Sequence, residues 1–62
     1  MNNEYIINDV TKEDLDILDR EGIMFTIMSV TYRKNRDYDT YNIRIEGDKL
    51  YYYMALNSIR RM

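Results

Sequence analysis

The stretch IMFTIMSVTY, residues 23–32, constrains the fold of this chain more than any other segment. It is rich in β-branched and aromatic residues, which is typical of a strand. Apolar side chains occupy both sides of its alternation: Ile23, Phe25 and Ile27 on one side, and Met24, Met28, Val30 and Tyr32 on the other. Because a strand that is apolar on both faces is typical of a covered position, we predict a central strand here.

A chain of 62 residues is short for covering both faces of such a strand. It makes one domain, residues 1–62, and a domain of this size buries only about 60% of the surface that the unfolded chain exposes. Small domains are commonly supplemented by a disulfide, a metal ion or a second subunit. The sequence contains no cysteine and no histidine, which excludes a disulfide and leaves only oxygen ligands for a metal. We therefore expect another protein, or a second copy of the chain in a homodimer, to supply the missing cover.

Two further segments predict strands. NEYIIN, residues 3–8, has the short apolar pattern of an edge strand. TYNIRIE, residues 40–46, alternates strictly, with Tyr41, Ile43 and Ile45 directed inward, as in a half-solvated antiparallel strand. Because the segment between residues 32 and 40 is mostly polar, residues 23–46 are predicted to form a β-hairpin.

The strongest local signal is a helix signature in VTKEDLDILDREG, residues 10–22. Thr11 is suited to the N-cap, and Asp14, three residues later, supplies the acid of a capping box. Val10 and Leu15 have the spacing of a hydrophobic staple. Gly22 supplies the left-handed residue that commonly ends a helix.

The C-terminal segment DKLYYYMALNSIRRM, residues 48–62, fits two interpretations. A strand after a two-residue turn would share one face among Leu50, Tyr52, Met54 and Leu56. A helix capped by Asp48 would align Tyr52, Ala55, Leu56, Ile59 and Met62. We favour a helix to the end of the chain, because the strand leaves Ile59 and the terminal arginines without a role.

On such a helix the three consecutive tyrosines have different environments. Tyr52 faces the core, whereas Tyr51 and Tyr53 lie about 100° to either side, so one of them is expected at the rim. The elements together predict an α+β domain of order β-α-β-β-α. In this fold, an antiparallel sheet carries two helices packed on one face.

Catalytic chemistry has little support in the sequence. Neither Ser29 nor Ser58 lies in a recognisable motif, and no cysteine or histidine is present to act as nucleophile or base. We expect a protein that is not an enzyme and uses no cofactor, metal or small-molecule substrate. No apolar run approaches 18 residues, so we expect no membrane partner and predict a cytoplasmic location.

Basic and aromatic residues suggest nucleic-acid binding through a basic β-hairpin, Arg33–Arg44. The candidate residues are Arg33, Lys34, Arg36, Tyr38, Arg44, Arg60 and Arg61. The net charge of −2 and the isoelectric point of about 4.9 argue against a general nucleic-acid binder. A small nucleic-acid-binding regulator is therefore the alternative function.

Seven tyrosines and five methionines favour protein–protein interaction. These residue types are adaptable, enriched at interfaces, and more abundant here than two short helices and a small sheet can bury. The candidate interface residues are Met24, Met28, Val30, Tyr32, Tyr51, Tyr53 and Met54. We therefore predict a non-enzymatic protein–protein interaction module. The composition is similar to that of small accessory proteins of phages and mobile elements, which favours a viral protein that inhibits or modulates a host or defence protein.

Overall fold

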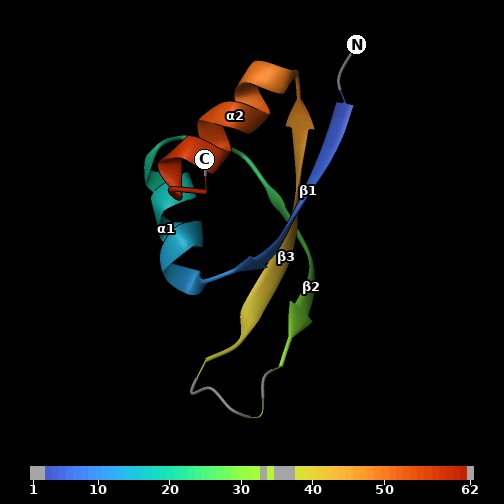
Figure 1. Ribbon diagram of the computed structural model, residues 1–62, viewed down its shortest axis with the longest axis vertical. Helices are drawn as coiled ribbons and strands as arrows, with labels where there is room; N and C mark the ends of the chain where they lie inside the picture. The colour runs from blue at the N-terminus through green and yellow to red at the C-terminus, as the bar shows by residue number, and fades with distance from the viewer. Residues whose placement is uncertain (1–2, 33, 35–37, 62) are drawn as a thin grey trace.

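The computed structural model describes residues 3–32, 34 and 38–61, and its elements follow the order β-α-β-β-α (Figure 1). The strands are β1 (Asn3–Val10), β2 (Thr26–Thr31) and β3 (Thr40–Gly47), and the helices are α1 (Lys12–Arg20) and α2 (Lys49–Ser58). Both strand pairs are antiparallel. The predicted α+β fold is thus confirmed.

The sheet has the strand order β1-β3-β2, which corrects the prediction of a central strand at residues 23–32. β3 is the central strand, and β2 lies at an edge and begins only at Thr26. The apolar residues before it serve another purpose. Ile23 is buried after the end of α1, and Phe25 packs against the core. Ile23 and Phe25 therefore pack against the core after the end of α1 and are not part of β2.

The capping signals of α1 are confirmed. Thr11 Oγ1 accepts a hydrogen bond from the amide of Asp14 at 3.1 Å, and Asp14 Oδ2 accepts one from the amide of Thr11 at 3.4 Å. At the other end, Gly22 has φ of 77° and the amide of Ile23 donates to the carbonyl of Leu18 at 2.9 Å. This pattern is a Schellman motif, in which glycine adopts the left-handed conformation without a steric penalty.

The helical interpretation of the C-terminal segment is confirmed, and the strand alternative is wrong. Asp48 Oδ1 accepts a hydrogen bond from the amide of Tyr51 at 2.9 Å, as an N-cap does. The helix ends at Ser58, earlier than predicted, because Arg60 turns to φ of 58° and the amide of Arg61 donates to the carbonyl of Leu56 at 2.8 Å. Met62 lies outside the described residues.

One apolar cluster forms the core. In the register of the sheet, Ile7 and Ile43 are directly opposite each other, so Ile7, Ile43 and Ile45 share one face. The cluster joins this face to both helices and comprises Ile7, Val10, Leu15, Leu18, Ile23, Ile43, Ile45, Ala55 and Ile59. The inward direction predicted for Ile43 and Ile45 is confirmed, since both are 0% exposed.

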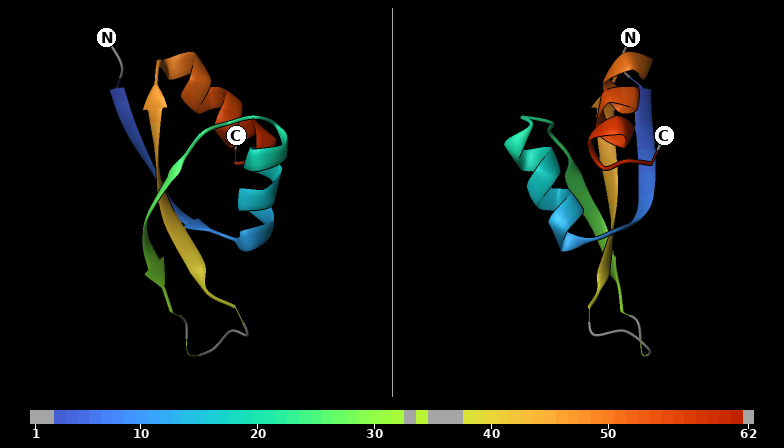
Figure 2. Two further views of the ribbon diagram at one scale, coloured as in Figure 1. Left: turned by 180° about the vertical axis from the view of Figure 1, so that it is seen from behind. Right: turned by 60° about the vertical axis from the view of Figure 1, so that its left-hand side comes forward.

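The molecule is elongated, measuring 39 × 19 × 18 Å along its principal axes. Both helices lie beside one half of the sheet, and the β2–β3 hairpin extends past them (Figure 2). In both views of Figure 2, the C-terminal part of β2 and the N-terminal part of β3 lie beyond α1 and α2. β2 therefore belongs to the part of the sheet with the least cover.

Candidate interaction surface

The side chains of β2 are exposed to solvent along almost the whole strand. Only Thr31 is partly buried. Three of the exposed residues are large and apolar: Ile27 is 47% exposed, Met28 54% and Val30 36%. Met24 and Tyr32, just outside the strand, are still more exposed. The described part of the chain thus gathers apolar side chains along one uncovered edge of the sheet.

A β-bulge at Met28 changes which side chains share a face. Ile27 lies opposite Ile43 and Val30 lies opposite Tyr41, and the register shifts between Ile27 and Ser29. Because directly opposed residues point to the same side, Ile27 and Val30 both face the side of the core. The sequence predicted that Ile27 and Val30 lie on opposite faces, and that Val30 shares a continuous apolar face with Met24, Met28 and Tyr32. Both predictions are therefore wrong.

The other face of the sheet is mostly polar, apart from the exposed Ile6 of β1, and its polar side chains are organised around Asn42. Its Nδ2 donates to Ser29 Oγ and to Thr31 Oγ1, each at 3.0 Å, and its Oδ1 accepts from the amide of Asp9 at 3.2 Å. One side chain of β3 therefore connects both edge strands. The exposed apolar side chains of β2 lie along that edge of the sheet, with Ile27 and Val30 on the side of the core.

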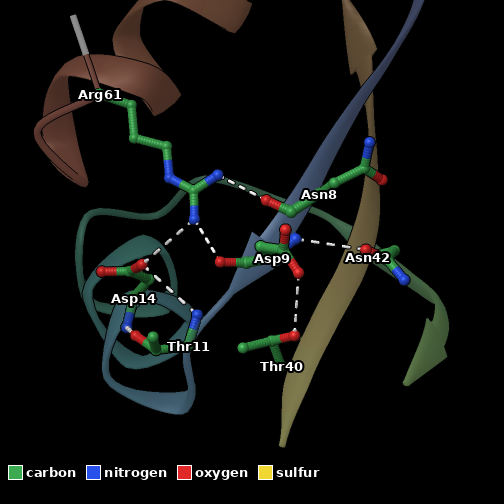
Figure 3. Close-up of polar contacts among 7 residues, drawn as sticks. All are labelled: Asn8, Asp9, Thr11, Asp14, Thr40, Asn42 and Arg61. Carbon is green, nitrogen blue, oxygen red and sulfur yellow. Dashed lines mark hydrogen bonds and ion pairs between the residues drawn. The ribbon is translucent and has the colours of Figure 1, made fainter. Parts of the chain in front are cut away.

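A residue from the far end of the chain covers the β1 edge at its C-terminal part. The register of β1 shifts between Ile7 and Val10, which marks a second bulge. At this bulge the Arg61 guanidinium donates to the carbonyl oxygens of Asn8 and Asp9. Figure 3 shows Arg61 approaching β1 from the side opposite β3, where it also lies 3.9 Å from the Asp14 carboxylate. A neighbouring strand would have to displace Arg61 in order to pair here.

The tyrosines of α2 divide between packing and exposure. Tyr51 Oη accepts a hydrogen bond from the amide of Met24 at 2.7 Å, which attaches the segment before β2 to the helix. The Tyr51 ring packs so closely on Gly47 that a Cβ there would lie 3.0 Å from Tyr51 Cδ2. Tyr52 packs against the core and stacks on Tyr5, with ring centroids 4.4 Å apart.

Tyr53 lies at the rim, where either Tyr51 or Tyr53 was expected. Its exposed fraction is 36%, and the Lys49 ammonium lies 5.8 Å from its ring centroid. Met54 is 58% exposed on the same helix. Among the predicted interface residues, Tyr53 and Met54 thus form a separate exposed area on α2, apart from the β2 edge.

The predicted nucleic-acid residues do not form one group in the described structure. Arg44 pairs with Glu46 at 3.2 Å and with Glu4 at 3.8 Å, and Arg61 is bound at the β1 bulge. Lys34, Tyr38 and Arg60 are exposed, and Arg33 and Arg36 lie outside the described residues. The intramolecular bonds of Arg44 and Arg61 reduce the positive charge that the surface offers to a phosphate.

The described residues form neither a metal site nor a membrane-spanning helix. They contain no group of three or more histidine, cysteine, aspartate or glutamate residues placed to hold a metal ion. None of the helices they form has the length and apolar character needed to span a membrane. Comparison of the chain with family models, with curated proteins and with solved structures finds no match.

Proposed function

We propose that the chain is a non-enzymatic protein–protein interaction module that binds its partner along β2. The observation that carries this proposal is the character of the strand. β2 lies at an edge of the sheet, contains no charged residue, and exposes Ile27, Met28 and Val30. Natural edge strands are usually protected by lysine, proline or a covering segment, so an unprotected apolar edge favours a partner strand or surface.

The proposed partner is a protein, because a sheet edge offers a chemistry that proteins match. Its main-chain amides and carbonyls hydrogen-bond an added strand, while the adjacent side chains supply apolar contact. Residues on the polar face already bond one another through Asn42, so they contribute less to a new contact. In its most specific form, which rests on composition, the proposal describes a cytoplasmic accessory protein of a phage or mobile element that modulates a host protein.

The experiment compares Met28→Asp with Met54→Asp. Both methionines are more than half exposed, but Met28 lies on β2 and Met54 on α2. Tagged forms of each variant and of the wild type are used as bait in extracts of the source cells, and their masses are measured by sedimentation. We expect Met28→Asp to lose the partner, or the oligomer, that wild type and Met54→Asp retain.

Circular dichroism verifies that both variants keep the helical signal of the wild type. A wild-type chain that stays monomeric and retains no protein would contradict the proposal. Equal binding by wild type and Met28→Asp would also contradict it, because a carboxylate on this strand must weaken an apolar contact.

A further inference from the structure

The β2 edge has the properties of a strand that pairs with its own copy. We propose that two copies of the chain pair antiparallel through β2, about a two-fold axis perpendicular to the sheet. Two three-stranded sheets then become one continuous sheet. This inference rests on the proposed function, for which it names the partner.

The sequence of β2 is close to symmetric about its own centre. When TIMSVT is aligned antiparallel with itself from end to end, Thr26 lies opposite Thr31 and Ile27 lies opposite Val30. Met28 and Ser29 then lie beside the axis. Threonine–threonine and β-branched apolar pairs are favourable across antiparallel strands. Because the strand carries no charge, no like charges meet in this alignment.

The bulge at Met28 makes this alignment compatible with the two faces of the sheet. Antiparallel strands related by such an axis must place opposed residues on the same face. In a regular strand, Ile27 and Val30 would point to opposite faces. The bulge places both on the core side, opposite Ile43 and Tyr41. Ile27 of one copy therefore meets Val30 of the other on the core side of the sheet.

The β1 edge is unsuited to self-pairing for two reasons: its charges would repel, and part of its main chain is already bonded. The same alignment of β1 would place Glu4 opposite Asp9, so two pairs of like charges would meet in each dimer. Arg61 also occupies carbonyls at the β1 bulge. With one edge available in each copy, pairing closes at the dimer and does not continue into a fibre.

The test is a charge swap beside the axis. Met28→Lys and Met28→Asp each place two like charges near each other in a self-paired dimer, whereas a mixture of the two variants places opposite charges there. We expect a wild-type dimer with twice the 7.6 kDa mass of the chain. The dissociation constant should rise at least about tenfold in each variant alone and recover in the equimolar mixture. Sedimentation equilibrium measures the dissociation constant of the wild type, of each variant alone and of the mixture.

Met54→Lys and Met54→Asp are the matched controls, with similar exposure on α2. They should dimerise as the wild type does. Amide hydrogen exchange supplies an independent measurement: dimerisation should slow exchange along β2 and leave β1 unchanged. If Met28→Lys loses its helical signal, Ser29→Lys and Ser29→Asp take the same role, because Ser29 is exposed and also lies beside the axis.

Two results would overturn the self-pairing. The first is a pure wild-type chain that remains monomeric at millimolar concentration. In that case, the proposed function would still be supported if the wild type captured a protein from extract and Met28→Asp did not. The second is a dimer that survives both Met28 substitutions separately, which would place the contact between copies elsewhere.

Discussion

Ile7 and Ile27 flank Ile43 in one row across the sheet, yet their surroundings differ greatly. Both lie directly opposite Ile43, one on β1 and the other on β2. Ile7 is 4% exposed and Ile27 is 47% exposed. The same residue type on the same face is therefore core on one edge and surface on the other. The difference shows that Ile7 contributes to the core, whereas Ile27 leaves apolar area exposed on β2.

The two edges also differ in how their main chain is protected. β1 carries Glu4 and Asp9, and Arg61 binds the carbonyls at its bulge. β2 has neither a charge nor a covering segment in the described part of the chain. Charge and cover are the usual means by which edge strands avoid unwanted pairing. Their presence on one edge alone supports the proposal that the other edge binds a partner.

The largest expected effect is the difference in stability between alanine substitutions of Ile7 and Ile27. Ile7→Ala should lower the free energy of unfolding by about 3 kcal/mol, because it removes a buried side chain from the core. Ile27→Ala should cost about 1 kcal/mol or less in the monomer, since its side chain is half exposed, but should weaken dimerisation. Urea unfolding at low protein concentration measures the first quantity, and sedimentation measures the second. Equal losses of stability would contradict the comparison.

Arg61→Ala tests the protection of β1. Loss of the guanidinium removes two hydrogen bonds to carbonyls and the ion pair with Asp14. The Arg61 side chain is 33% exposed. We expect a loss of about 1–2 kcal/mol, reduced from the value for a buried charged donor by solvent screening. Arg60→Ala is the control, because Arg60 is the neighbouring exposed arginine.

Urea unfolding compares the two arginine variants, and hydrogen exchange at β1 reports the local effect. Faster exchange of β1 amides in Arg61→Ala, with little change in Arg60→Ala, is the expected result. If both variants behaved alike, Arg61 would have no special role at the β1 edge.

Asn42→Ala should affect both edges at once. Asn42 bonds Ser29 and Thr31 on β2 and the amide of Asp9 on β1. Each bond contributes about 1 kcal/mol or less, and water replaces part of it at this exposed face, so we expect a total loss of about 1 kcal/mol. Exchange of β1 and β2 amides should accelerate together. Acceleration on a single strand would show that Asn42 does not couple the two edges.

Local signals in the sequence predicted the helices well, whereas the arrangement of the sheet required long-range information. The capping box of Thr11 and Asp14 lies within one helical turn, so the residues themselves define it. The order of the strands depends on pairing between distant segments, and an apolar run alone does not distinguish an edge from a centre.

Two features of the candidate interaction surface could not be predicted for the same reason. The bulge at Met28 interrupts the alternation on which the predicted faces of β2 were based. The contact of Arg61 with Asn8 joins residues 53 positions apart, and no local pattern indicates it. The exposure of β2 follows from its position at the edge of the sheet, which also depends on pairing between distant segments.

The smallest expected effect concerns the backbone that delivers Arg61 to β1. Both helices end in the same motif, with Gly22 at φ of 77° after α1 and Arg60 at φ of 58° after α2. A residue with a Cβ is strained in this conformation, so Arg60→Gly should raise the free energy of unfolding by about 0.5–1 kcal/mol. Arg60→Ala keeps the strain, so it should not raise the free energy of unfolding. Urea unfolding distinguishes them, and dimerisation through β2 should be equal in both, because neither substitution alters that edge.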